Sequence, residues 1–245
     1  MTTPAAHRNT AIRIKDLSKI YHTAAQDFVA LQDVTMSIHA GAFVCVVGRS
    51  GSGKSTLINM ITGIDSPSSG KIWVDDVRLK DMNENELALW RGKHIGIVFQ
   101  FYQLLPMLTL VENVLFPMEV AGLYSAGERL DRAMDLLSRV DLADAAHQRP
   151  GEVSGGQQQS AAVARALAND PPILIADEPT GNLDSRAAER IFQLFDELAR
   201  AQKTVLMVTH DEDLAARGDR RLRLSDGMLV GDERMSSSMA GDGHA

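Results

Sequence analysis

A glycine-rich segment between a predicted strand and a predicted helix carries the first chemistry of this chain. The segment fits the pattern G-x-x-x-x-G-K-[ST] and reads Gly48-Arg49-Ser50-Gly51-Ser52-Gly53-Lys54-Ser55-Thr56. Its glycines let backbone N–H groups surround an anion, and the helix that follows adds a partial positive charge at its N-terminus. Lys54 is expected to reach the β- and γ-phosphates of a nucleoside triphosphate, and the Ser55 hydroxyl to ligate Mg²⁺.

Two carboxylates stand at the end of a second apolar run. The sequence Ile173-Leu174-Ile175-Ala176 predicts a buried strand, and Asp177 and Glu178 follow it. Sites in open α/β sheets lie at the carboxyl ends of strands. Asp177 is therefore predicted to hold Mg²⁺, and Glu178 to polarise the water that attacks the γ-phosphate. A solvated strand end is the alternative, which the presence of a phosphate-binding loop disfavours.

Three further polar residues adjoin predicted elements. Gln100, at the end of the apolar run 95–99, could ligate Mg²⁺ and hydrogen-bond the attacking water. His210, at the end of the run 204–209, could donate a hydrogen bond to the γ-phosphate. Asp184 precedes a predicted helix and could simply cap it. Taken one at a time, each residue fits an ordinary structural role better, and only their order along the chain argues for a site.

The segment Ser154-Gly155-Gly156-Gln157 predicts a helix N-terminus with no side chain to obstruct a phosphate. Ser154 can cap the helix and offer a hydroxyl, while Gly155 and Gly156 permit close backbone approach. If this helix cannot reach the nucleotide of its own subunit, a second copy of the chain must supply it. The segment therefore predicts a clamp driven by nucleotide binding.

The elements that must position these residues alternate between strands and helices. This alternation predicts a mainly parallel α/β core with antiparallel edges and a helical insertion of about 60 residues. Asn83 is the expected N-cap of one helix, and Asp226-Gly227 the turn of a hairpin that joins 221–225 to 228–230. The other predicted strands cover residues 12–21, 31–38, 43–47, 71–74, 95–99, 173–176 and 204–209. The predicted helices cover residues 54–62, 84–90, 110–120, 128–140, 155–169 and 185–202.

Composition limits the function. The chain has 245 residues, of which 44% are hydrophobic and 23% charged, and this suits one large domain or a core with a subdomain. Its net charge of -7 gives no bulk attraction to nucleic acid or anionic lipid. The single cysteine, Cys45, excludes an internal disulfide and is interpreted as a small buried hydrophobe. With neither a secretory signal nor an apolar run of about 18 residues, the chain is expected to be cytoplasmic.

The order of these motifs resembles the nucleotide-binding subunit of ABC transporters, from residue 11 to residue 232. The resemblance implies an α/β fold: a P-loop NTPase (RecA-like) core with an antiparallel β subdomain and an α-helical subdomain inserted at about 101–169. It implies ATP and Mg²⁺ as cofactors and catalytic roles for Gln100, Glu178 and His210, with Asp184 also at the nucleotide. It implies that Tyr21 stacks on adenine, although Tyr21 could equally be a strand-edge residue. Residues 1–10 and 235–245 are expected to be flexible tails.

The resemblance also implies two kinds of partner. Two copies are expected to bind head to tail, so that Ser154, Gly155 and Gly156 of one copy face the γ-phosphate held by Lys54 of the other. Hydrolysis then removes a shared anion and the interface opens. Integral membrane permease subunits are the second partner, and they alone are expected to hold the chain at the inner face of the cell membrane.

Finer motifs at 99–106, 108–114 and 177–184 resemble the lipoprotein-release, macrolide-export and cell-division group. We therefore expect dimer closure to power a separate permease for export, extraction or release of a substrate. The alternative is a clamp that transmits force across the membrane for signalling, without cargo. An ATPase acting on DNA or the ribosome fits less well, because the chain is acidic and has no coiled-coil insertion. A nucleotide kinase fits less well because it has no use for a Ser-Gly-Gly-Gln helix.

Two positions depart from the family pattern. Ser160 stands where arginine is usual, which puts the interface contacts of its helix in doubt, and Ala42 stands where glutamate is usual. The permease is expected to dock beside the segment after Gln100. Tyr102, Leu105 and Met107 are expected to face it, and internal packing of this apolar segment is the alternative.

Overall fold

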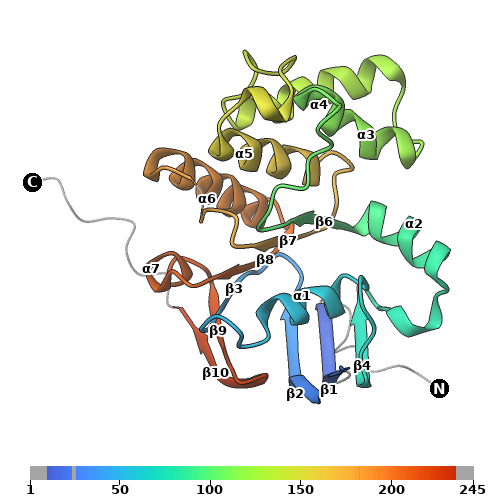
Figure 1. Cartoon of the computed structure of the whole chain (residues 1–245), viewed down its shortest axis with the longest axis vertical. Helices are drawn as coiled ribbons and strands as arrows, with labels where there is room; N and C mark the ends of the chain where they lie inside the picture. Colours follow the sequence, from blue (N-terminus) through green and yellow to red (C-terminus); the bar gives the residue numbers. More distant parts are fainter. Residues whose placement is uncertain (1–9, 24–25, 182, 236–245) are drawn as a thin grey trace, which may run out of the picture.

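Two β-sheets organise the described residues, which are 10–23, 26–181 and 183–235 of the computed structural model (Figure 1). The larger sheet has the order β10-β9-β3-β8-β7-β6 and is parallel except at β10, and the smaller sheet has the order β2-β1-β4-β5 and is antiparallel. The strands of the larger sheet are β3 (Phe43–Val47), β6 (Ile95–Val98), β7 (Ile173–Asp177), β8 (Thr204–Thr209), β9 (Arg220–Ser225) and β10 (Met228–Arg234). Those of the smaller sheet are β1 (Thr10–His22), β2 (Asp27–His39), β4 (Ser69–Val74) and β5 (Val77–Arg78).

The helices separate into a central helix and an outer layer. Helix α1 lies between the two sheets, in contact with β2, β4 and β7, while α3, α4 and α5 form the layer at the top of Figure 1 and α6 lies beneath it. The α-helices of the described residues are α1 (Lys54–Ile61), α2 (Glu84–His94), α3 (Leu110–Val120), α4 (Ala126–Arg139), α5 (Gly155–Ala166), α6 (Ser185–Arg200) and α7 (Glu212–Ala215). The outer layer is inserted between β6 and β7, so the chain leaves the sheet and returns to it at neighbouring strands.

The larger sheet is buried on both faces, which explains its continuous apolar strands. In β3, Phe43, Cys45 and Val47 point into the core shared with α5 and α6. Val44 and Val46 point into the second core, which α1 and the smaller sheet complete. The structure thus confirms Cys45 as a buried hydrophobe, and burial raises the pKa of its thiol to about 12.

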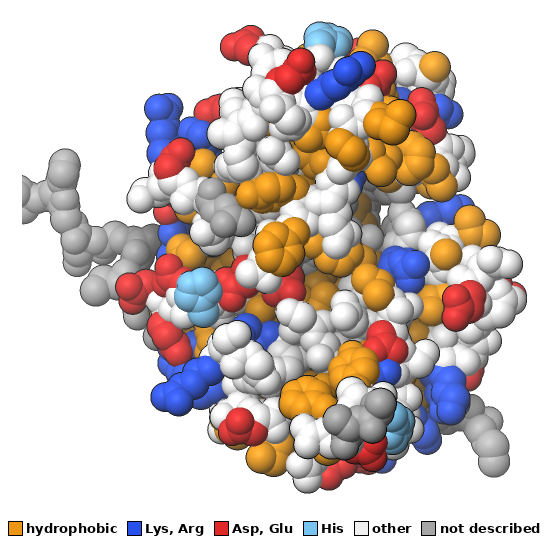
Figure 2. Space-filling view, in the orientation of Figure 1, with side chains coloured by type: hydrophobic (Ala, Val, Ile, Leu, Met, Phe, Trp, Pro, Cys, Tyr) orange, Lys and Arg blue, Asp and Glu red, His pale blue; other side chains and the backbone are white. Residues whose placement is uncertain are grey.

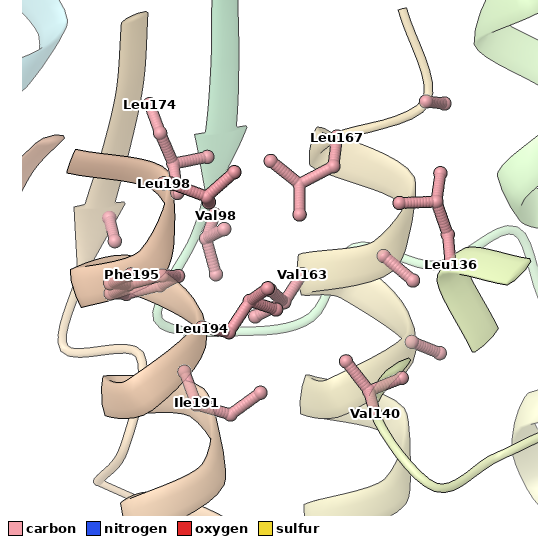
Figure 3. Packing of buried hydrophobic residues seen from close by; sticks show 14 of the residues in the cluster. Val98, Leu136, Val140, Val163, Leu167, Leu174, Ile191, Leu194, Phe195 and Leu198 are labelled. Carbon is pink, nitrogen blue, oxygen red and sulfur yellow. The ribbon is translucent and has the colours of Figure 1, made fainter. Parts of the chain in front are cut away.

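The outer helices are joined to the sheet by one apolar cluster (Figure 3). Phe195 and Leu198 of α6 lie near Leu174 of β7, and Val163 and Leu167 of α5 approach them from the other side. Burying each of these side chains contributes about 1.5–3 kcal/mol. The N-terminus of α5 is therefore held on a helix that is packed firmly against the core.

The predicted order of strands and helices is confirmed, with some boundaries shifted. The helix predicted at 128–140 begins earlier, at Ala126, because Ser125 Oγ accepts the N–H of Glu128 and caps it. The helix predicted at 155–169 ends at Ala166. Asn83 is confirmed as an N-cap, but its helix continues to His94.

The predicted hairpin turn is confirmed at Asp226-Gly227. The two residues have φ +49 and +76, which is the pair of positive angles that a two-residue type I′ turn requires. The predicted tails lie almost entirely outside the described residues, although Thr10 already belongs to β1 and pairs with His39. None of the described helices is both long and apolar enough to span a bilayer.

Candidate nucleotide-binding site

The phosphate-binding loop joins β3 to α1. Gly53, at the start of the helix, has φ +100, and a Cβ there would lie 2.5 Å from the carbonyl oxygen of Ala30. Strand β2 therefore packs directly against the loop. Lys54 Nζ donates hydrogen bonds to the carbonyl oxygens of Gly48 and Arg49, at 2.8 and 3.0 Å, and these bonds hold its ammonium group across the loop.

Ser55, Asp177 and Gln100 bring three oxygen donors to one place. Ser55 Oγ donates to Asp177 Oδ2 at 2.8 Å, and Gln100, just after β6, lines the same pocket. Burial raises the pKa of the Asp177 carboxyl, and neighbouring Glu178 adds to this effect, while the Ser55 hydrogen bond and Lys54 oppose it. Hydroxyl, carboxylate and amide oxygens suit a hard cation, so these residues fit the predicted Mg²⁺ site.

Glu178 and His210 form a pair at the ends of β7 and β8. Glu178 has φ +50, and its N–H donates to the carbonyl oxygen of Val208 at 2.9 Å. Its side chain is only 12% exposed, and Oε2 lies 2.8 Å from Nδ1 of His210, whose side chain is 73% exposed. A sheltered carboxylate is thus held by an imidazole that is open to a ligand.

These groups line one pocket of about 550 Å³, within the usual size of a small-molecule site. The pocket is lined by Phe28, Ala30, Ser50, Gly51, Gly53, Lys54, Ser55, Thr56, Gln100, Asp177, Glu178 and His210. All except Phe28 and Ala30 were predicted from the sequence. Those two precede the strand predicted at 31–38, and the only signal in the sequence was a phenylalanine close ahead of that strand.

Three predicted residues lie beside this pocket rather than in its lining. Gly48 and Ser52 line a second pocket of about 430 Å³, on the side of the loop that faces β9. Tyr21 Oη donates to Asp65 Oδ2 at 2.9 Å, and Lys19 Nζ lies 4.8 Å from the centre of the Tyr21 ring. Burial raises the pKa of Tyr21, and the hydrogen bond to Asp65 adds to it.

Ser154-Gly155-Gly156-Gln157 opens α5 and contributes nothing to the lining of the nucleotide pocket. Ser154 Oγ accepts the N–H of Gln157 at 3.2 Å, and Gln157 Oε1 accepts the N–H of Ser154 at 2.9 Å. A Cβ on Gly155 would lie 2.7 Å from Oη of Tyr102, so the structure places Tyr102 against this helix. The two glycines leave the helix N-terminus without bulk.

Two other positions that the sequence singled out, Asp184 and Ser160, lie outside the nucleotide pocket. Asp184 Oδ1 accepts the N–H of Ala187 at 2.8 Å and caps α6, as the sequence allowed, and Asp184 does not line the nucleotide pocket. Ser160, in place of the usual arginine, is buried within α5 with 6% of its surface exposed.

Arg165 connects α5 to the segment that carries Gln100. Its Nη1 donates to the carbonyl oxygen of Gln103 at 2.6 Å, and its Nη2 to that of Tyr102 at 3.0 Å. Burial lowers the pKa of the guanidinium group. A displacement of α5 would therefore pull on the backbone two and three residues after Gln100, whose side chain lines the pocket.

An apolar groove of about 410 Å³ lies between α2 and α3. Figure 2 shows hydrophobic side chains gathered over α3, beside a hollow that opens toward α2. Leu89 of α2 and Val120 of α3 line the groove and are 64% and 65% exposed. Asn169 Nδ2 donates to the carbonyl oxygens of Gly92 and Pro117, at 2.7 and 3.2 Å, and so joins the two walls.

Comparison with known proteins shows the family. The ABC transporter family model matches residues 31–181, which is more than half of the chain, so the protein belongs to this family. It is 48% identical over 206 residues to lipoprotein-releasing system ATP-binding protein LolD 1 of Chlorobium chlorochromatii, with 84% of each chain covered. It is 42% identical over 228 residues to the macrolide export ATP-binding/permease protein MacB of Rhodopseudomonas palustris, covering 93% of this chain and 35% of MacB.

A solved structure agrees with the fold. The dimeric, post-hydrolysis state of the ATP-binding cassette MJ0796 of Methanocaldococcus jannaschii, bound to ADP and Pi, matches with a TM-score of 0.89 and 40% identity. The match covers 92% of this chain and 99% of that one. The chain is thus an ATP-binding, ATP-hydrolysing subunit of ABC transporter type, which confirms the predicted fold and activity and favours transport over the signalling alternative.

Proposed function

We propose that this protein hydrolyses Mg-ATP at the interface of a homodimer and that closure of the dimer powers membrane permease subunits. One observation carries the proposal. The pocket holds a phosphate-binding loop, a set of oxygen donors and the Glu178–His210 pair, whereas the open N-terminus of α5 lies outside its lining. A helix N-terminus free of bulk suits a phosphate, and a second copy of the chain is the molecule that can present it.

The residues of the pocket divide the chemistry. Lys54 and the loop N–H groups bind the phosphates, and Ser55, Asp177 and Gln100 would hold Mg²⁺, which neutralises phosphate charge when bound. Glu178 accepts the proton of the attacking water. His210 holds the Glu178 carboxylate in place through its 2.8 Å contact and meets the γ-phosphate with its exposed edge.

The nucleotide pocket of one copy requires residues from a second copy, and this explains why the protein forms a dimer. Ser154, Gly155 and Gly156 of one copy close over the nucleotide held by Lys54 of the other, and we assign Tyr21 to the adenine and Asp184 to the same nucleotide. The dimeric state of MJ0796 with ADP and Pi supports this arrangement. Loss of the γ-phosphate removes the anion that both copies bind, so the two copies separate.

The groove between α2 and α3 is the proposed seat of a permease helix at the inner face of the membrane. Its exposed Leu89 and Val120 offer an apolar surface. Leu105 and Met107, which the sequence predicted to face the permease, are 40% and 83% exposed but do not line the groove. Names of relatives support the direction: LolD belongs to a lipoprotein-releasing system and MacB to macrolide export. We therefore assign export, extraction or release to the complex.

The groove assignment is tested by placing a charge in it. Leu89→Asp and Val120→Asp change exposed side chains, so both variants are expected to fold and bind ATP as the parent protein does, yet to lose co-purification with the permease. The matched control is Leu130→Asp, on α4, whose side chain is 46% exposed and outside the groove lining. Equal co-purification of all three variants would refute the docking site.

A further inference from the structure

We infer that Gln159 of α5 is a positioning residue for the metal site: its side-chain amide holds the carbonyl oxygen of Phe99 and thereby places Gln100 at the bound cation. The inference rests on the Mg²⁺ site proposed above and names a residue on which that site depends. Gln159 does not line the nucleotide pocket, whereas Gln100 does. Gln159 therefore acts on the metal only through Gln100.

The contact between Gln159 and Phe99 fixes the peptide unit that carries Gln100. Gln159 Nε2 donates to the carbonyl oxygen of Phe99 at 3.3 Å. Because the peptide bond is planar, the carbonyl group of Phe99 and the N and Cα atoms of Gln100 move together. The pairing of β6 with β7 ends at Val98, so this peptide unit lies just beyond the last residue pair of the two strands. A side chain from α5 thus holds the backbone at the point where the strand pairing ends.

Helix α5 holds Gln100 from both directions along the chain. Gln159 binds the carbonyl oxygen of the residue before Gln100. Arg165 donates to the carbonyl oxygens of Tyr102 and Gln103, which follow it. One helix therefore supplies donors on either side of the metal ligand, and the contact made by Gln159 is the nearer of the two in the chain. Its loss should change the direction of the Gln100 side chain more directly than any other substitution on α5.

The burial of Gln159 argues against a role in stability alone. The residue is 1% exposed, and its Oε1 has no hydrogen-bond partner among the described residues. An unsatisfied buried acceptor lowers the stability of the folded state, whereas an apolar side chain of similar shape would not. The amide oxygen of Gln159 thus weakens the fold, and the benefit of the amide lies in its nitrogen, which reaches Phe99. Placement of Gln100 accounts for a polar side chain at this buried position.

The experiment measures Mn²⁺ binding to the full chain by electron paramagnetic resonance, in the presence of a non-hydrolysable ATP analogue. Gln159→Met keeps an unbranched side chain and removes both polar atoms of the amide. Mn²⁺ affinity should fall about tenfold or more, as it does when a group that orients a metal ligand is lost. The free energy of unfolding in urea should stay near that of the parent protein, because the lost hydrogen bond and the removed unsatisfied oxygen have opposite effects. Affinity for the metal-free nucleotide should not change.

Two comparisons isolate the role of Gln159. Gln158→Met is the matched control: Gln158 Nε2 donates to the carbonyl oxygen of Val153 at 3.4 Å, so this variant should bind Mn²⁺ like the parent protein. The second comparison is a double-mutant cycle with Gln100→Ala. Gln100→Ala alone should weaken Mn²⁺ binding, and the addition of Gln159→Met should weaken it no further, because Gln159 acts through Gln100.

Three results would overturn the inference and leave the metal site intact. The first is an Mn²⁺ affinity of Gln159→Met equal to that of Gln158→Met. The second is a further loss of Mn²⁺ affinity in the Gln100→Ala background, which would show that Gln159 acts on another group. The third is a loss of stability and of metal-free nucleotide binding in Gln159→Met, which would show a general packing role. If Gln100→Ala itself binds Mn²⁺ like the parent protein, the assignment of Gln100 to the metal is wrong as well.

Discussion

Arg165 offers a direct measure of how firmly the segment after β6 is held. Arg165→Met keeps an unbranched apolar stem but removes the donors to the carbonyl oxygens of Tyr102 and Gln103. A hydrogen bond to a charged group contributes about 1.5–3 kcal/mol. Because the freed carbonyls can recover part of that through water, we expect a loss of about 2–4 kcal/mol in the free energy of unfolding. For a chain of this size that lowers Tm by about 5–15 °C.

Urea denaturation of Arg165→Met beside Arg139→Met is the assay. Arg139 pairs with Glu197 at 3.3 Å, with side chains 37% and 64% exposed, and such surface pairs contribute at most about 1 kcal/mol. Mg-ATP turnover should also fall in Arg165→Met, since Gln100 belongs to the released segment. If the two variants lose equal stability and retain equal turnover, the Arg165 contacts do not hold the segment in place.

Two further predictions concern side chains on β3 and next to β7. Glu178→Gln should bind ATP, lose about 10²–10⁴ in hydrolysis rate and accumulate as ATP-bound dimers in light scattering; normal turnover would contradict its role. Cys45, whose pKa is raised to about 12 from 9.0, should react with a thiol reagent at pH 8 only after unfolding. Its unfolded thiol ionises first as pH rises, so Cys45 contributes stability that is lost between about pH 9 and 12, and a native thiol titrating near pH 9 would disprove this.

The motifs at strand ends could be predicted because parallel strands deliver their carboxyl ends to one edge of a sheet. Asp177, His210 and Gln100 each follow an apolar run, and the sheet brings them together whatever the connecting segments do. The phosphate-binding loop is similarly local, since strand, glycines and helix are consecutive. Of the pocket lining, this accounts for every residue outside β2.

Phe28 escaped prediction because its position depends on contacts across the whole chain. The pairing of Phe28 with Tyr21, and the close approach of Ala30 to both Gly53 and Gly227, join residues that no local pattern connects. The position of Tyr102 escaped for the same reason. The missing Cβ of Gly155 makes room for its hydroxyl on a helix that is distant in the sequence, while the contact of Tyr102 with the permease stays a prediction.

The insertion of α3–α5 between β6 and β7 determines where this chain can accept insertions and deletions. β6 is the edge strand and β7 is its parallel neighbour, so the inserted helical segment begins and ends at the same edge of the sheet. Closing a longer excursion costs only about 0.6 kcal/mol for each doubling of its length. Residues could therefore be added or removed at the exposed turn between α3 and α4 without altering strand order, provided that Arg165 and Asn169 keep their anchoring bonds.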